Sequence, residues 1–479
     1  MKILALRLLD RLDEHISAQL LLLYGRDVFL DPWFDGAEGP TRFTGLHGAA
    51  FLGIVEIVAA VLDVKGWDFN EADCTGSTPL IWAAVRGNDR VVKMLLERND
   101  VDPNRADTNY GRTPLSWATG KGYEKVVKVL LDREDVNPDQ PDTKNGWTPL
   151  MWAAVKGYEG VVKMLLERRD LDPNQEVTRN GHTLLFWAAE NRHERVIKML
   201  LEREDLNPNQ TDTNNDHTLL SWAAMNGDEG VVKVLLERGD VNPDHPNTKH
   251  GQTPLSWAAM NGHEGVVKML LEREDVNPNQ TDILSGRTPL SWAAWMGREG
   301  VVKMLLEQGE VNPNQPDTKY CRTPLTWAAE NGHQRIVKML LERENVNPNQ
   351  VDTFYGWTPL SWAAEKGHEW VVKMLLERKN DNPDQADTSY GRTPLTWAAR
   401  GGRQCVVKML LEREDVNPDR ADTICNQTPL SWAIENGHEE IVKMLMERKN
   451  LRSATPDDVN ITSQSLAPSG GLVCCEDPS

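Results

Sequence analysis

The chain has 479 residues, a formal net charge of -19 and six cysteines. Binding to nucleic-acid phosphates requires clustered Lys and Arg, so this acidic balance argues against a nucleic-acid binder. The cysteines are scattered and form no C-x-x-C pair, which argues against a zinc knuckle or a redox motif and favours a reducing, intracellular compartment. No apolar run reaches the roughly 18 residues of a membrane span, so we expect no membrane insertion.

The first 40 residues are leucine-rich and differ from the rest of the chain. They begin MKILALRLLDRLDEHISAQLLLLYG, a pattern that favours a helix. A repeat array needs its terminal unit covered. We therefore predict that residues 1–40 form an N-terminal helical cap and a linker.

From residue 41 onward, one unit returns twelve times. Its marker is a threonine before a helical pattern, and the first interval between these threonines is 34 residues, whereas the other ten are 35 residues each. A fixed period of this size indicates stacked supersecondary units. The twelve positions are Thr44, Thr78, Thr113, Thr148, Thr183, Thr218, Thr253, Thr288, Thr323, Thr358, Thr393 and Thr428.

One unit, GQTPLSWAAMNGHEGVVKMLLERE, shows the local structure that each unit predicts. Thr253 suits an N-cap and Pro254 the first helical position, and Gly262 suits the end of that helix. A second, amphipathic helix follows over about residues 263–273. The connector EDVNPNQTDILSG predicts an extended or hairpin-like segment. Helices this short cannot bury their apolar faces alone, so neighbouring units must stack.

The pattern TPL[ST]WAA–x–x–G–H–x–x–VVKMLLE, followed by a polar DVN segment, resembles the ankyrin repeat over residues 41–449. The resemblance implies an all-α ankyrin-repeat solenoid of about twelve helix–turn–helix repeats with finger-like connectors and a concave binding face. The sequence departs from the family in two respects. The family's TPLH histidine is retained at His47 and is Ser or Thr in most other units, and the fingers are longer than usual.

The leader and the following FTGLHGAAFLGIVEIVAAVL resemble the junction of fungal NACHT–ankyrin signalling proteins, in which a nucleotide-binding switch precedes the repeats. This chain contains no G-x-x-x-x-G-K-[ST] phosphate loop. At the other end, residues 450–479 are polar and rich in Ser and Pro, so we predict a disordered C-terminal tail.

No pattern in the sequence supports catalysis or metal binding. A calcium-like series of oxygen ligands begins at Asp135, but Gln140 and Gly146 stand where an EF-hand requires Gly and Glu. Neither HExxH nor a Ser–His–Asp arrangement rises above chance. Eleven tryptophans recur with the motif, from Trp82 to Trp432, and we expect them to fill the core. We predict a protein that is not an enzyme and has no cofactor and no metal.

Positions that change between otherwise similar units are the candidate binding residues. They lie just before each Thr-Pro, just after each Ala-Ala and at the finger ends, and Arg and aromatic residues, which form interaction hot spots, are frequent there. The alternative is neutral drift at solvated sites. Our candidates for a partner-binding concave face are Tyr110, Arg112, Trp147, His182, His217, Arg287, Trp295, Tyr320, Arg322, Tyr355, Trp357, Tyr390, Arg392 and Arg400.

The sequence therefore predicts a non-catalytic, monomeric scaffold that binds a partner protein. Two alternatives remain open: the ligand-sensing arm of a larger NACHT-type signalling ATPase, and an adaptor that delivers client proteins to a separate enzyme. We expect a cytoplasmic protein, with the nucleus as the alternative, because no Lys/Arg-rich cluster is present.

Overall fold

The computed structural model describes residues 43–64, 66–174, 182–212, 216–378 and 382–453. The predicted N-terminal cap, residues 1–40, lies outside the described residues. The predicted tail begins at residue 450, but the last helix continues through Ser453, and residues 454–479 lie outside the description.

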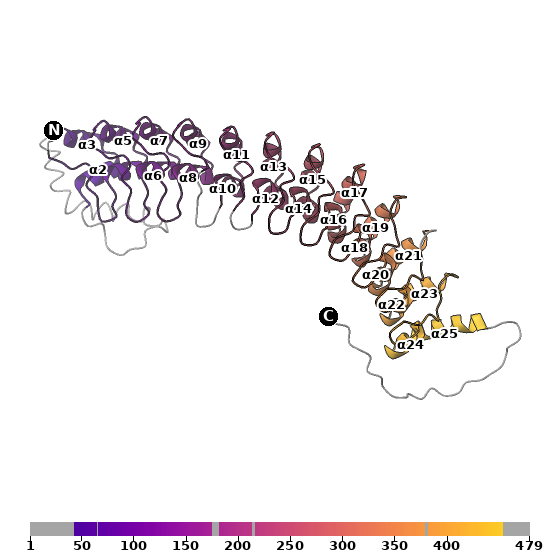
Figure 1. Cartoon of the computed structure of the whole chain (residues 1–479). Coiled ribbons are helices and arrows are strands. Elements are labelled where there is room, and N and C mark those ends of the chain that lie inside the picture. The colour runs from indigo at the N-terminus through magenta and orange to yellow at the C-terminus, as the bar shows by residue number, and fades with distance from the viewer. Residues whose placement is uncertain (1–42, 65, 175–181, 213–215, 379–381, 454–479) are drawn as a thin grey trace. The chain divides into compact units, whose positions relative to one another are not determined.

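The described residues form 24 helices in twelve consecutive pairs, and the fingers join one pair to the next (Figure 1). The first helices of the pairs are α2 (Gly45–Leu52), α4 (Pro79–Arg86), α6 (Pro114–Lys121), α8 (Pro149–Lys156), α10 (Leu184–Glu190), α12 (Leu219–Asn226), α14 (Pro254–Asn261), α16 (Pro289–Met296), α18 (Pro324–Glu330), α20 (Pro359–Lys366), α22 (Pro394–Arg400) and α24 (Pro429–Glu435). The second helices are α3 (Val55–Leu62), α5 (Asp89–Leu96), α7 (Glu124–Leu131), α9 (Glu159–Leu166), α11 (Glu194–Leu201), α13 (Glu229–Leu236), α15 (Glu264–Leu271), α17 (Glu299–Glu307), α19 (Gln334–Leu341), α21 (Glu369–Leu376), α23 (Gln404–Leu411) and α25 (Glu439–Ser453).

The chain divides into two compact units. The first ends at Ala223 and includes Gly230–Asn242, and the second comprises Ala224–Glu229 and the residues after Asn242. Within each unit, first helices pack on first helices and second helices on second helices, so two layers enclose one apolar core (Figure 1). None of the described helices is long and apolar enough to cross a membrane.

Local sequence signals set the helix ends as predicted. The Thr253 hydroxyl accepts a hydrogen bond from the Ser256 amide at 3.2 Å, and Gly262 ends α14 in the left-handed conformation with φ 84°. The second helix is shorter than predicted and ends at Leu271. Its end tightens because the Arg273 amide donates to the carbonyl of Leu270, three residues back, instead of continuing the α-helical pattern.

The histidine of the first repeat makes contacts that its Ser and Thr replacements do not. His47 Nδ1 accepts from the Thr44 amide at 3.1 Å, and His47 Nε2 lies 3.1 Å from the carbonyl oxygen of Glu71, in the next connector. Ser256, which replaces the histidine in the repeat of α14, pairs only locally, its hydroxyl lying 3.2 Å from that of Thr253. The other repeats therefore need another bond to hold the finger against the first helix.

We predict that Thr358→Val lowers the local free energy of unfolding by about 1 kcal/mol, because the capping oxygen is lost. Thr358 is 1% exposed, and its hydroxyl accepts from the Ser361 amide at 3.1 Å. The measurement is native-state hydrogen exchange of the α20 amides. Thr353→Val, at an exposed finger position, is the matched control. Equal exchange in the two variants would contradict a role for the cap.

Candidate functional site

The motif tryptophans hold the fingers in place. In eight repeats the indole N–H donates to an aspartate in the finger of the same repeat, with nitrogen–oxygen distances of 2.8–3.1 Å. In six of these eight repeats the tryptophan is buried, as predicted for the core, and in the other two it is half-buried. In all eight the indole also replaces the finger contact that His47 makes in the first repeat. The pairs are Trp82–Asp73, Trp117–Asp107, Trp152–Asp142, Trp292–Asp282, Trp327–Asp317, Trp362–Asp352, Trp397–Asp387 and Trp432–Asp422.

Each of these carboxylates also organises the finger turn. Asp352 Oδ1 accepts from the amides of Tyr355 at 2.8 Å and Gly356 at 3.1 Å, while Oδ2 accepts from Trp362 Nε1 at 2.8 Å. In the next repeat, burial raises the pKa of Asp387, and hydrogen bonds from the Tyr390 amide and the Trp397 indole oppose that rise. The finger is thus fixed through one buried carboxylate.

Two repeats lack this aspartate. Val177 stands ten residues before Trp187, and Asn247 stands ten residues before Trp257. The buried Trp187 Nε1 has no hydrogen-bond partner among the described residues. Asn247 keeps part of the turn, because its Oδ1 accepts from the Gln252 amide at 2.9 Å. The indole–aspartate hydrogen bond that holds the finger is therefore not the same in every repeat.

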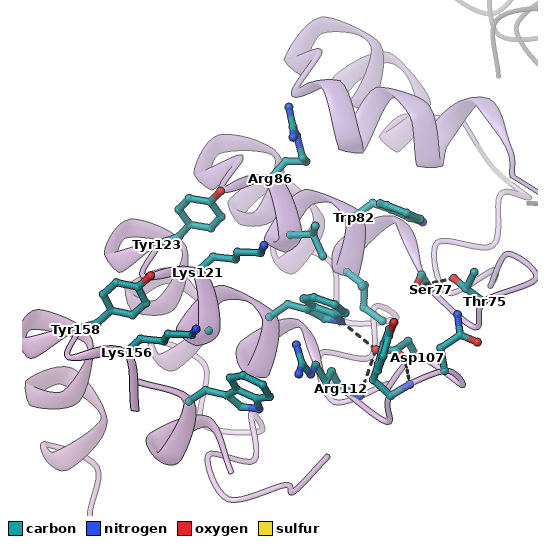
Figure 2. A pocket seen from close by; sticks show the side chains of 17 residues that line it. Thr75, Ser77, Trp82, Arg86, Asp107, Arg112, Lys121, Tyr123, Lys156 and Tyr158 are labelled. Atoms are coloured by element: carbon teal, nitrogen blue, oxygen red, sulfur yellow. Dashed lines mark hydrogen bonds between the residues drawn. The ribbon is translucent and has the colours of Figure 1, made fainter. Parts of the chain in front are cut away.

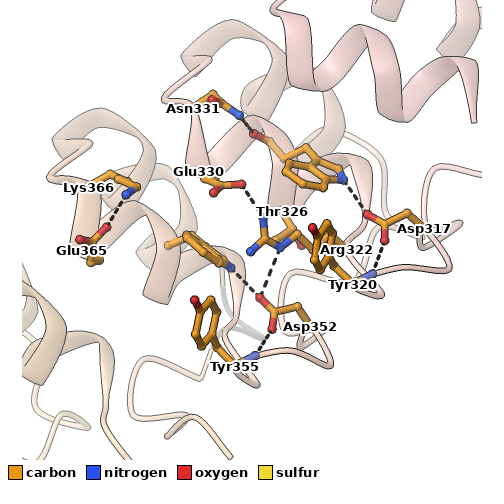
Figure 3. A network of polar contacts seen from close by, with 12 residues as sticks. Asp317, Tyr320, Arg322, Thr326, Glu330, Asn331, Asp352, Tyr355, Glu365 and Lys366 are labelled. Atoms are coloured by element: carbon orange, nitrogen blue, oxygen red, sulfur yellow. Dashed lines mark hydrogen bonds and ion pairs between the residues drawn. The ribbon is translucent and has the colours of Figure 1, made fainter. Parts of the chain in front are cut away.

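The residue before each Thr-Pro joins one repeat to the next. The Arg322 guanidinium lies 4.6 Å from the ring centre of Trp327 in its own repeat and 4.1 Å from that of Trp362 in the following repeat. Its Nε is 3.5 Å from Asp352 Oδ2, and its Nη1 is 2.8 Å from Glu330 Oε2 (Figure 3). Burial raises the pKa of Glu330, while the charge of Arg322 opposes the rise. A cation–π contact that is shielded from water in this way contributes about 2 kcal/mol to the attraction between the two side chains.

The same slot between two indoles recurs in both units. Where it holds Arg, the distances from the guanidinium carbon to the two ring centres are 3.8–4.8 Å, for Arg112 between Trp117 and Trp152, Arg287 between Trp292 and Trp327, and Arg392 between Trp397 and Trp432. Where it holds Trp, the ring centres are 4.3–5.1 Å apart, for Trp147 between Trp152 and Trp187, and Trp357 between Trp362 and Trp397.

These contacts correct the prediction for part of the candidate site. Six candidates are only 5–7% exposed, so the expectation that they line an open surface is wrong. The drift alternative also fails at these positions because they are not solvated. In the Arg and Trp cases the physical reason is the slot, which accepts flat side chains between consecutive indoles. The six residues are Arg112, His217, Arg287, Arg322, Trp357 and Arg392.

The other eight candidates are half-buried and keep part of their surface open. In the first unit they are Tyr110, Trp147 and His182, and in the second unit Trp295, Tyr320, Tyr355, Tyr390 and Arg400. Their neighbours along the chain include the buried slot residues. Tyr355, for example, packs 5.2 Å from Trp357 between ring centres. The eight residues therefore lie at the edge of the aromatic stack, where rings are held rigidly.

Four fingertip residues of the second unit are not among the fourteen candidates, although Phe354 lies at one of the variable finger ends. Ile283, Leu284, Phe354 and Ile424 are 60–66% exposed, although all four are apolar. The signal was present in the sequence, because most other fingers carry Thr and a polar residue at these two places, as in DTKY and DTSY. We call the eight half-buried candidates and these four fingertip residues the inner face, each unit having its own part.

The fold defines a class of protein, the helical repeat solenoid, because twelve helix pairs with fingers recur at one period. A family model described as ankyrin repeats (3 copies) matches residues 14–107, 46–142, 99–177, 134–212, 169–245, 220–317, 310–387 and 379–456. Together these matches cover most of the chain, which belongs to the ankyrin repeat family. A comparison with curated proteins gives no match.

We predict that Arg392→Ala lowers the free energy of unfolding of its repeats by about 3–5 kcal/mol, because the slot between Trp397 and Trp432 is emptied and the buried Asp422 loses its ion-pair partner. The Arg392 and Asp422 side chains are 5% and 0% exposed and lie 3.3 Å apart. Arg392→Trp should restore the packing part of that loss but not the ion pair, since Trp147 and Trp357 occupy the same slot elsewhere in the chain. Hydrogen exchange in α22 and α24 measures both effects, and equal losses in the two variants would refute the slot.

We predict opposite pH effects for two aspartates replaced by asparagine. The pKa of Asp387 is raised by burial, so the unfolded chain releases this proton first and wild-type stability falls as pH rises from about 4. Asp387→Asn should therefore gain stability relative to wild type over that interval. The pKa of Asp415 is lowered by its hydrogen bond with Arg413, so the ion pair stabilises the fold above the unfolded pKa and is lost on acidification.

Asp415→Asn should accordingly lose stability relative to wild type as pH rises through the same region. The measurement is the thermal unfolding midpoint of wild type and both variants between about pH 3 and pH 7. For each variant we take the difference in unfolding midpoint from wild type. If this difference changed in the same direction with pH for both variants, Asp387 would not be a carboxyl held in a desolvated site.

Proposed function

We propose that this chain is a non-catalytic scaffold that binds a partner protein through its inner face. Ankyrin repeats form a protein–protein interaction module. The observation that carries the finer proposal is the exposure of apolar fingertips in alternate fingers of the second unit, where Ile283 is 66% and Phe354 is 60% exposed. Most other fingers are polar at these places, and exposed apolar residues that recur on one face are candidates for partner contacts.

Rigid aromatic residues beside the fingertips support this proposal. The Phe354 ring packs edge-on against Tyr320 of the preceding finger and Tyr355 of its own finger, with ring centres 6.1 Å and 4.5 Å apart. Aromatic side chains held in place lose little conformational entropy on binding, and Tyr and Trp are enriched in hot spots. The inner face therefore offers exposed apolar side chains beside aromatic side chains that are already held in place before a partner binds.

Two of the described histidines have structural roles, which accounts for them without catalysis. His333 Nε2 lies 3.1 Å from the Trp295 carbonyl oxygen, and His368 Nε2 lies 3.0 Å from that of Glu330, so each histidine ties a second helix to the preceding repeat. The four described cysteines form no disulfide, which supports a reducing compartment such as the cytoplasm. We further propose that the chain acts there as a monomer.

We test this proposal by affinity capture from the native cell, comparing wild type with the double variant Phe354→Ser and Ile424→Ser. We expect the double variant to lose a partner that wild type retains, because both changes remove exposed apolar contacts. Trp370→Ser is the matched control, since Trp370 is 61% exposed on the second helix α21. All three proteins must give the same circular dichroism spectrum. Capture of the same partner by every variant, or of none by wild type, would contradict the proposal.

A further inference from the structure

A cavity of about 380 Å³ lies on the first unit, across the repeats of α4, α6 and α8 (Figure 2). Its volume lies within the range of roughly 300–1,000 Å³ typical of ligand pockets. Three indoles line it, those of Trp82, Trp117 and Trp152, together with the ring of Tyr110. The indole of Trp117 and the amide of Arg112 both donate to the lining carboxylate of Asp107, so this acid is already satisfied by hydrogen bonds.

Basic side chains of three successive repeats line the same cavity. Arg86, Lys121 and Lys156 end the first helices α4, α6 and α8, all three are exposed, and Figure 2 shows them following one another along these helices. A basic residue at a helix end also complements the helix dipole. That effect does not account for the aromatic lining that the three residues share. We call this feature, Arg86, Lys121 and Lys156 with the cavity beside them, the basic groove.

The residues before the three basic side chains add no charge to the groove. Val85 and Val155 are apolar, and Gly120 has no side chain. A Cβ at Gly120 would lie 3.6 Å from the Trp152 ring, so glycine leaves space beside that ring. In the second unit, Glu330, Glu365 and Glu435 occupy three of the corresponding places, and Met260, Trp295 and Arg400 occupy three others. Glu365 also pairs with Lys366 at 3.0 Å.

We propose that the basic groove binds an acidic peptide segment of the partner, with an apolar side chain against the indoles and carboxylates facing Arg86, Lys121 and Lys156. This inference rests on the proposed function and names the chemistry of the partner at one place. Helices pack about 8–10 Å apart, and a polyproline II segment advances about 3.1 Å per residue with three residues per turn. Carboxylates at every third residue of such a segment lie on one face about 9 Å apart, which matches basic residues one repeat apart.

Charge and burial favour a peptide over a nucleic acid. A nucleic acid presents a continuous row of phosphates and requires clustered Lys and Arg over a wide surface, whereas this chain carries a net charge of -19. A peptide can present a few carboxylates to the basic side chains and place an apolar side chain against the aromatic lining of the cavity. Rim charges of this kind contribute mainly to specificity and to the association rate.

The test is a selection of peptides from a randomised display library on the full chain, followed by affinity measurement of the enriched peptides. We expect them to carry Asp or Glu at every third residue around an apolar residue. The double variant Lys121→Glu and Lys156→Glu should weaken binding about tenfold or more, and added salt should weaken it further. The matched control is Lys128→Glu with Lys163→Glu, which makes the same charge change on the second helices α7 and α9.

Four results would overturn the inference. Enriched peptides without the acidic pattern, or equal weakening by the two double variants, would exclude the basic groove while leaving the scaffold function in place. If a single-stranded oligonucleotide competes for the groove as well as the acidic peptide does, the groove binds polyanions in general and is not specific for a peptide. If no peptide is enriched on the wild-type chain, the acidic-peptide inference and the peptide-binding scaffold fail together.

Discussion

The hydrogen bond from a buried indole to a buried carboxylate is the interaction on which the rest of the structure depends. In the repeat of α20, Asp352 receives the Trp362 indole and two finger amides, so a single carboxylate fixes the finger to the first helix. The Trp362 ring is then positioned to receive Arg322 of the preceding repeat, 4.1 Å away. Finger geometry and repeat stacking thus follow from the same residue pair.

Much of the fold could be predicted from sequence because it depends on local signals. The Thr253 cap and the left-handed Gly262 were predicted from residue type and position, and the structure confirms them. The stack itself follows from the period and from helices too short to bury a face alone. The ends of the second helices were less accurate, because the tightened turn at Arg273 depends on a hydrogen bond that residue types do not specify.

The candidate site was predicted less well, and Arg322 shows why. A variable Arg in a repeat protein resembles a surface contact, yet its ion pair and its second indole come from residues thirty or more positions away. In six repeats the position instead fills a slot between two indoles, which holds Arg in four repeats and Trp in two. Ile424 was missed for the opposite reason, since an apolar residue suggests burial but here occupies a fingertip that is 63% exposed.

Because the slot joins consecutive repeats, its occupant sets how strongly those repeats are coupled. Repeat stability is close to a sum of intrinsic and nearest-neighbour contributions. Arg392 contacts two indoles and a carboxylate, whereas Trp357 packs between two indoles. The two side chains therefore contribute differently to the stability of the interface between repeats. Substitution in the buried slots can therefore tune the array while leaving the other residues of the inner face in place, with the exception of Trp147, which fills a slot and also belongs to the inner face. If the inner face binds the partner as proposed, stability and partner recognition depend mostly on adjacent positions of the same short motif.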